Sequence, residues 1–241
     1  MSRFLVTATW DDVPHLSQQA KDALLKGIPA YQRDARTKGV PQLGAGAIYP
    51  VSEDDFVVND FELPDHFPRG YGLDVGWNRT AGIWGAKDPS SDTVYLYSEH
   101  YRGEAEPIIH AAAIKLRGEW MNGVIDPASR GRSQRDGRKL LNDYVGLKLN
   151  LSLAINAVES GIYDVWTRLS TGRLKVFKSC SNWLSEYRVY QRDEKGKVVK
   201  QNDHLMDATR YLIVSGLPKM TVIPTALKIA RPRNKAVSAW N

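Results

Sequence analysis

Three acidic residues lie in surroundings where a carboxylate is unusual. Asp74 stands inside the apolar run 71–77, which predicts a buried strand. A charged group in such a place is unfavourable unless it is paired or bound to a cation. Asp126 ends a second short apolar run, and Asp207 lies in a helical stretch near the end of the chain. Because divalent cations prefer carboxylate oxygens, this set indicates a metal site.

Each acid also has a purely structural interpretation. Asp74 could pair with an arginine such as Arg79, and Asp207 could be a solvated helix residue. Asp126 precedes Pro127, and for this residue alone a strand-ending turn is the better explanation. All three structural explanations must hold together for the site to be absent, so the pattern favours the metal site.

The helix that carries Asp207 offers two more candidate ligands. His204 lies three residues earlier and therefore projects from the same helix face. Asp203 is a third candidate, although its position also suits a helix N-cap. Carboxylates of this kind hold two Mg²⁺ or Mn²⁺ ions about 4 Å apart in two-metal enzymes. An imidazole ligand at His204 would favour Mn²⁺ somewhat over Mg²⁺.

The predicted elements form a mixed α/β arrangement. Apolar patterning predicts an antiparallel meander of strands over 71–77, 80–86 and 93–101. The remaining predictions are helices over 106–117, 138–145 and 162–170, strands over 123–126, 149–154 and 174–177, a hairpin over 187–200 with its turn at 193–196, and a helix over 203–214. Strand–helix–strand succession implies parallel neighbours in the second half. This order is typical of an RNase H-like mixed sheet flanked by helices.

The chain divides into three predicted parts. Residues 1–69 form an N-terminal segment that is rich in turn formers. It contains one helix over 17–26, capped by Ser17, and the segment ends in a polar linker over 59–69. Residues 70–218 form the compact domain. Residues 219–241 form a basic tail without any acidic residue.

Charge and composition favour a polyanionic partner in a reducing compartment. The net charge is +6 and the isoelectric point about 9.3. Basic residues gather in two places that are predicted to contact DNA phosphates, although a merely solvated surface explains the second equally well. They are Arg130, Arg132, Arg135, Arg138 and Lys139 beside Asp126, and Arg188, Lys195 and Lys197 in the predicted hairpin. The single cysteine, Cys180, excludes an internal disulfide, and no apolar run is long enough to span a membrane or act as a signal peptide.

Three motifs taken in order resemble the C-terminal nuclease domain of the large terminase subunit of tailed bacteriophages. They are residues 71–80 (YGLDVGWNRT), 124–128 (VIDPA) and 202–211 (NDHLMDATRY). The resemblance implies an RNase H-like fold with a site laid out as in Holliday-junction resolvases. It implies that Asp74, Asp126 and Asp207 bind the metals, with His204 at a ligand position that is acidic in some relatives. Residues 8–16 (ATWDDVPHL) resemble the stretch that follows the ATPase core in this family.

The resemblance also implies an activity and partners. We expect an endonuclease that cuts concatemeric viral double-stranded DNA during genome packaging, leaving a 5′-phosphate and a 3′-hydroxyl. The expected cofactors are two Mg²⁺ or Mn²⁺ ions. The expected partners are the terminase ATPase domain, the small terminase subunit and the portal, in the host cytoplasm. A P-loop is absent, since Gly196–Lys197 is followed by Val198, so we expect no ATP hydrolysis by this chain itself.

Three other functions fit parts of the pattern. An actin-like or sugar-kinase ATPase shares the spacing from Asp74 to Thr80, but it needs a second glycine-rich phosphate hairpin. A non-catalytic DNA-binding module would use the basic segments but leaves a buried Asp74 unexplained. A cellular RNase H or junction resolvase would use the same chemistry on another nucleic acid. Such enzymes begin near the first strand, whereas here residues 1–69 precede it, which counts against this alternative.

Overall fold

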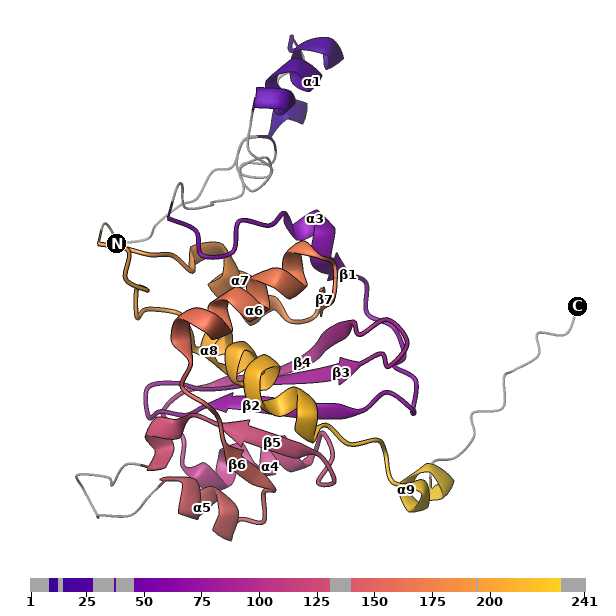
Figure 1. The fold of residues 1–241 in the computed structure, drawn as a ribbon, viewed down its shortest axis with the longest axis vertical. Helices are drawn as coiled ribbons and strands as arrows, with labels where there is room; N and C mark the ends of the chain where they lie inside the picture. Colours follow the sequence, from indigo (N-terminus) through magenta and orange to yellow (C-terminus); the bar gives the residue numbers. More distant parts are fainter. Residues whose placement is uncertain are drawn as a thin grey trace, which may run out of the picture.

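A seven-stranded mixed sheet forms the centre of the computed structural model (Figure 1). The structure describes residues 9–12, 15–27, 37, 46–130, 140–193 and 195–230. The strands, in their order across the sheet, are β1 (Val57–Val58), β7 (Leu174–Phe177), β4 (Val94–Arg102), β3 (Thr80–Lys87), β2 (Arg69–Asp74), β5 (Asn122–Ile125) and β6 (Leu151–Leu153). β2, β3 and β4 are antiparallel neighbours, and the other pairs are parallel. The predicted meander joined to parallel strands is therefore confirmed.

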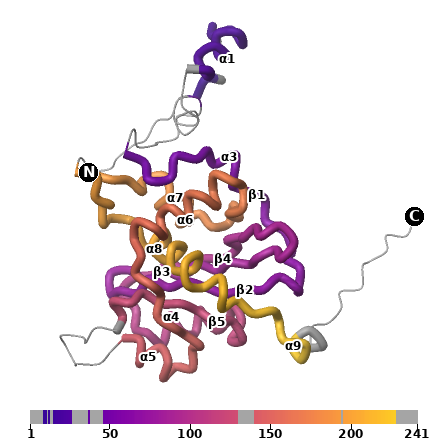
Figure 2. Tube along the Cα trace, viewed as in Figure 1, coloured from indigo at the N-terminus to yellow at the C-terminus, as the bar shows by residue number. Residues whose placement is uncertain are grey.

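Helices cover both faces of the sheet. The first face carries α6 (Val158–Ser170), α7 (Ser181–Val189) and α8 (His204–Tyr211), and Figure 2 traces α8 across β2 and β3. The second face carries α4 (Pro107–Lys115) and α5 (Leu140–Gly146). Further helices among the described residues are α1 (Gln18–Gly27), α3 (Glu53–Phe56) and α9 (Thr225–Ala230). Within the described ranges, no helix has the length and apolar character that a bilayer crossing requires.

The alternation of side chains along β2 decides which residues meet α8. Tyr71 and Leu73 point into the core under α4 and α5. Gly72 and Asp74 therefore point to the opposite face, towards α8. A Cβ atom on Gly72 would collide with the carbonyl oxygen of Ala208, so this glycine lets the backbone of α8 approach β2 closely. Asp74 is the next residue along on this face, and it lies at the start of α8.

Four predicted elements differ clearly from the structure, and one of them is the helix predicted over 162–170, which begins at Val158. The first strand ends at Asp74 rather than at residue 77, because the chain turns into β3 and Thr80 Oγ1 donates a hydrogen bond to the Gly76 carbonyl (3.1 Å). The predicted hairpin over 187–200 is wrong at its start, since residues 187–189 form the end of α7. Its turn survives as a single antiparallel bridge, Arg192 with Val198. The last helix ends at Tyr211 and continues as a π-helical turn, Leu212–Gly216.

Part of the predicted N-terminal segment belongs to the sheet and its core. β1 adds an edge strand beside β7, and Ile48, Tyr49 and Phe56 pack into the core under α6 and α7. The helix predicted over 17–26 is confirmed as α1, with Ser17 Oγ accepting a hydrogen bond from the Ala20 amide (3.3 Å). The division of the chain at residue 70 stays a prediction.

Candidate metal centre

Asp74 and His204 form the heart of the candidate site. Asp74 ends β2 on the face that α8 covers, and His204 is the first residue of α8. The Nδ1 atom of His204 donates a hydrogen bond to Asp74 Oδ2 over 2.8 Å. The Asp74 side chain is 17% exposed and the His204 side chain 35%, so the pair remains accessible from solvent. The glycine contact between β2 and α8 brings these two residues within reach of each other.

The charges around Asp74 favour a cation. Burial raises the pKa of Asp74; the hydrogen bond from His204 opposes that rise, and the Asp207 and Asp126 carboxylates add to it. Asp74 in turn raises the pKa of His204 through their hydrogen bond. Two further carboxylates thus act electrostatically on Asp74 at this end of the sheet. Negative charges gathered in this way are stabilised by a bound cation.

Asp126 directly follows β5, the parallel neighbour of β2. Its amide donates a hydrogen bond to the Leu73 carbonyl (2.9 Å), which continues the pairing of β5 with β2. Its Oδ1 atom accepts hydrogen bonds from the Tyr211 hydroxyl (3.1 Å) and the Ala128 amide (2.9 Å). Because Tyr211 ends α8, that one helix contacts Asp74 through its first residue and Asp126 through its last. Tyr211 was missed by our sequence analysis, although it lies seven residues after His204 and so shares its helix face.

Asp207 and Asp203 face a lysine instead of Asp74. Lys200 Nζ lies 2.9 Å from Asp207 Oδ2 and 3.0 Å from Asp203 Oδ2. The other oxygen of Asp207 pairs with Arg210 Nη2 (3.0 Å), whose side chain is only 1% exposed. Both oxygens of Asp207 are therefore neutralised by cations. Asp203 does occupy the predicted N-cap position of α8, but its side chain makes no capping hydrogen bond.

The donor atoms suit a divalent ion, although they do not form a finished site. Within the described parts of the chain, no three His, Cys, Asp or Glu side chains converge as a metal site would require. Asp74 and His204 do converge, and Asp126 is close enough to act on the pKa of Asp74. Carboxylate oxygen with one imidazole nitrogen suits Mn²⁺ or Mg²⁺. Asp207 would join this set only by exchanging Lys200 for the ion.

The residues predicted to contact DNA fall into three groups: one forms an ion pair within the protein, two are exposed, and the others lie wholly or in part outside the described residues. Arg188 makes a two-point ion pair with Glu53, with Nε and Nη2 at 2.6 and 2.7 Å from the two carboxylate oxygens. Lys195 and Lys197 are exposed. Arg130 ends a 3₁₀ turn directly after Asp126. Its side chain, and all of Arg132, Arg135, Arg138 and Lys139, lie outside the described residues.

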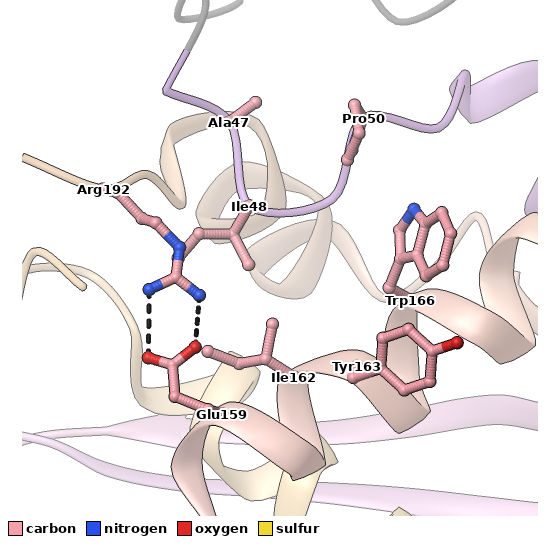
Figure 3. A pocket seen from close by; sticks show the side chains of 8 residues that line it. All are labelled: Ala47, Ile48, Pro50, Glu159, Ile162, Tyr163, Trp166 and Arg192. Atoms are coloured by element: carbon pink, nitrogen blue, oxygen red, sulfur yellow. Dashed lines mark hydrogen bonds and ion pairs between the residues drawn. The ribbon is translucent and has the colours of Figure 1, made fainter. Parts of the chain in front are cut away.

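A separate hollow of about 390 Å³ lies between α6 and the chain at residues 47–50 (Figure 3). Apolar side chains, among them Ile162, Tyr163 and Trp166, line it, and an ion pair between Glu159 and Arg192 stands at one side. None of the candidate metal ligands lines this hollow. The acidic cluster, which comprises Asp74, Asp126, Asp207 and His204, therefore lies elsewhere on the molecule.

Comparisons with known proteins identify the family of this chain. The family model described as "Terminase RNaseH-like domain" matches residues 71–215, which contain the strands and the helix of the acidic cluster. This chain belongs to that terminase family. The large terminase subunits of Enterobacteria phage LP7 and Salmonella phage P22 are each 32% identical to it over 223 residues. Those matches cover 87% of this chain but 46% and 44% of the relatives, so the chain spans less than half of their length.

Solved terminase structures share the fold. The nuclease domain of the P22 large terminase is 30% identical with a TM-score of 0.68, and the match covers 74% of this chain and 96% of that domain. A large terminase from a thermophilic bacteriophage, solved in complex with ADP, has a TM-score of 0.62 at 23% identity, covering 86% of this chain and 54% of that protein. The predicted RNase H-like fold and the predicted family are thus confirmed.

Proposed function

We propose that this terminase domain is a metal-dependent endonuclease that cuts concatemeric viral double-stranded DNA during genome packaging. The observation that carries the proposal is the pairing of Asp74, at the end of β2, with His204, together with the position of Asp126 directly after the adjacent strand β5. Family membership supports the same conclusion, because the matched P22 structure is a nuclease domain. A lone ion pair with His204 would not account for the further effect of the Asp126 and Asp207 carboxylates on the pKa of Asp74.

The proposed ligands are the acids and the histidine of this site. Asp74, Asp126, His204 and Asp207 would hold the two ions, and Asp203 is a further candidate. When bound, the ions supply an attacking hydroxide and stabilise the leaving oxygen. The chain itself holds the carboxylates in place, since the Tyr211 hydroxyl orients Asp126. Mg²⁺ or Mn²⁺ is the proposed cofactor. The large terminase nuclease of phage G20c, which shares the fold at 14% identity and a TM-score of 0.52, was crystallised with cobalt, so Co²⁺ belongs in the assay.

The proposed partners follow from the family. Double-stranded DNA would contact the basic residues that follow Asp126 in the sequence and the exposed lysines Lys195 and Lys197. The terminase ATPase domain, the small terminase subunit and the portal are the proposed protein partners, and the proposed place of action is the host cytoplasm.

A plasmid assay tests the proposal. Supercoiled DNA is incubated with the chain and Mn²⁺, Mg²⁺ or Co²⁺, with and without chelator, and RNA–DNA hybrid and branched junction DNA serve as rival substrates. Asp74→Asn should abolish the cutting that the wild type shows, whereas Asp164→Asn, an exposed acid on α6, should cut like the wild type. Equal cutting by the wild type and Asp74→Asn would contradict the proposal. Mn²⁺ binding is measured calorimetrically in parallel, and a wild type that neither cuts nor binds the ion would also contradict it.

A further inference from the structure

The start of α8 is capped by a residue from another helix. The first amides of a helix have no partner within it and need an acceptor. Asp203, at the N-cap position, accepts no hydrogen bond from these amides, and its carboxylate pairs with Lys200 instead. The Leu205 amide instead donates to Glu186 Oε2 (2.5 Å). Glu186 belongs to α7, so the cap comes from outside the helix that it serves.

Glu186 is itself held firmly. Only 3% of the residue is exposed, and its Oε1 atom accepts a hydrogen bond from the Tyr101 hydroxyl on β4 (2.8 Å). Burial raises the pKa of this carboxyl, whereas the hydrogen bonds from Tyr101 and Leu205 oppose that rise. A buried carboxylate at a helix N-terminus interacts favourably with the helix dipole. Both oxygens are thus engaged on two different elements.

The helix that carries Glu186 is fixed in the same manner. The amides of Asn182 and Trp183, at the start of α7, donate to the two oxygens of Glu99 on β4 (2.9 Å each). Trp183 Nε1 donates to Thr209 Oγ1 on α8 (2.8 Å). A continuous set of hydrogen bonds therefore runs from β4 through α7 to α8, and it ends one residue from His204.

We propose that Glu186 is a positioning residue that sets His204 against Asp74. His204 directly precedes Leu205, so the bond from Glu186 fixes the rotation and height of the turn from which the imidazole projects. Glu186 touches neither Asp74 nor the proposed ions, and it acts only through the first turn of α8. The inference rests on the proposed function, because it treats His204 as a ligand of the proposed metal site.

A neighbouring hollow makes the cap replaceable. A pocket of about 200 Å³ lies beside the Glu186 side chain and is lined also by Tyr101, Asn182, Ser185, Val189 and Asn202. Glu186→Ala would leave the Leu205 amide without its acceptor next to this open space. A small carboxylate such as formate could enter it and accept from that amide, as anions commonly do at helix N-termini.

The test compares Glu186→Ala and Glu186→Gln with Thr209→Val in the full 241-residue chain. Thr209→Val removes two buried hydrogen bonds, from Trp183 Nε1 and to the Leu205 carbonyl, but it removes no bond of Glu186. Mn²⁺ affinity is measured by calorimetry, the His204 ring signal by NMR without metal, and the melting temperature by circular dichroism. We expect Glu186→Ala to weaken Mn²⁺ binding by about 10- to 100-fold and to shift the His204 signal. Glu186→Gln keeps an acceptor oxygen and should retain most of the affinity.

Formate should restore both signals in Glu186→Ala, whereas chloride at the same ionic strength should not. Thr209→Val should lower the melting temperature without changing the affinity or the His204 signal. Wild-type affinity in Glu186→Ala would overturn the inference. So would a loss of affinity that simply follows the melting temperature across all variants. If the wild type binds no Mn²⁺, the proposed function fails, and the His204 signal in metal-free protein still decides the role of Glu186.

Discussion

At the scale of single residues, Lys200 competes with the proposed metal ion for the carboxylate of Asp207. Its ammonium group pairs with both Asp203 and Asp207, which is the neutralisation that a bound cation would otherwise provide. More than half of the lysine side chain is exposed, so the pairing is worth at most about 1 kcal/mol. An ion of higher charge can therefore displace it without a large cost.

Lys200→Met should strengthen metal binding. Removing the competing ammonium should raise Mn²⁺ affinity roughly two- to fivefold, which corresponds to the loss of a partly exposed ion pair. Without metal, the same variant should melt at a lower temperature, because Asp207 and Asp203 lose a counter-charge. Calorimetry and thermal melts measure both effects, with Lys197→Met, an exposed lysine of the same segment, as the control. Unchanged or weaker binding in Lys200→Met would remove Asp207 from the proposed ligand set.

The sequence predicted the members of the cluster better than their contacts. The spacing of Asp74, Asp126 and His204 sufficed to expect one site, because strand ends and a helix face define directions. The bond from Tyr211 to Asp126 and the pairing of Lys200 with Asp207 depend on how α8 and residues 191–200 lie in space. Such contacts between distant elements leave no local pattern in the sequence. The ligand roles themselves stay predictions.

At the scale of elements, the approach of α8 to β2 depends on Gly72. Gly72→Ala would push a methyl group into the Ala208 carbonyl and force the helix away from the strand. We expect a loss of about 1–3 kcal/mol in the free energy of unfolding, as overpacked cores show, together with weaker Mn²⁺ binding. Gly146→Ala is the matched control, since a Cβ there meets nothing within 4 Å. Urea unfolding measures the difference, and equal stability of the two variants would refute the close approach.

A buried histidine pair makes the packing of α4 on the sheet sensitive to acid. His100 Nε2 on β4 and His110 Nδ1 on α4 share a hydrogen bond of 2.8 Å, and His110 Nε2 donates to the Ala105 carbonyl (3.1 Å). Burial, together with the smaller effects of the charges on His110, Arg117 and Arg102, lowers the pKa of His100 to about 4. The unfolded chain has the ordinary value near 6.5 and so binds more protons between these values.

The stability that neutral His100 provides is therefore complete above about pH 6.5 and is lost as the pH falls towards 4. His100→Asn should flatten the dependence of the melting temperature on pH in this window, although it lowers that temperature at neutral pH. His66→Asn, at an exposed histidine, should leave the wild-type profile unchanged. A wild-type melting temperature that is constant from pH 7 to pH 4 would contradict the assignment.

Helix α7 shows why one element was missed. Its sequence, SNWLSEYRV, includes Trp, Tyr and Val, which favour strands, and it is only nine residues long. Its N-cap residue, Cys180, makes no capping bond, and the amides are satisfied by Glu99 from 83 and 84 residues away. Long-range capping therefore stabilises a helix that local propensity does not indicate. The meander and the parallel strands were predictable because apolar runs and short turns define them locally.

At the scale of the whole molecule, binding to DNA should depend on the basic residues that remain unpaired with acids. Arg188 forms an ion pair with Glu53, and Arg192 forms one with Glu159. Lys195 and Lys197 are exposed. Lys195→Ala/Lys197→Ala should reduce the slope of log affinity against log salt by about 1–2, because each phosphate contact contributes roughly 0.9. Arg188→Ala should leave that slope unchanged. Fluorescence anisotropy with duplex DNA measures the slopes, and identical values for wild type and the double variant would exclude these lysines from the DNA surface.

Divalent ions are proposed to bind at Asp74, and anomalous diffraction tests this central claim most directly. Crystals of the wild type and of Asp74→Asn are soaked in Mn²⁺, and data are collected at an energy where manganese scatters anomalously. We expect a strong peak within coordination distance of the Asp74 carboxylate and His204 in the wild type, and its loss in Asp74→Asn. Peaks found only elsewhere, or an unchanged peak in Asp74→Asn, would contradict the claim.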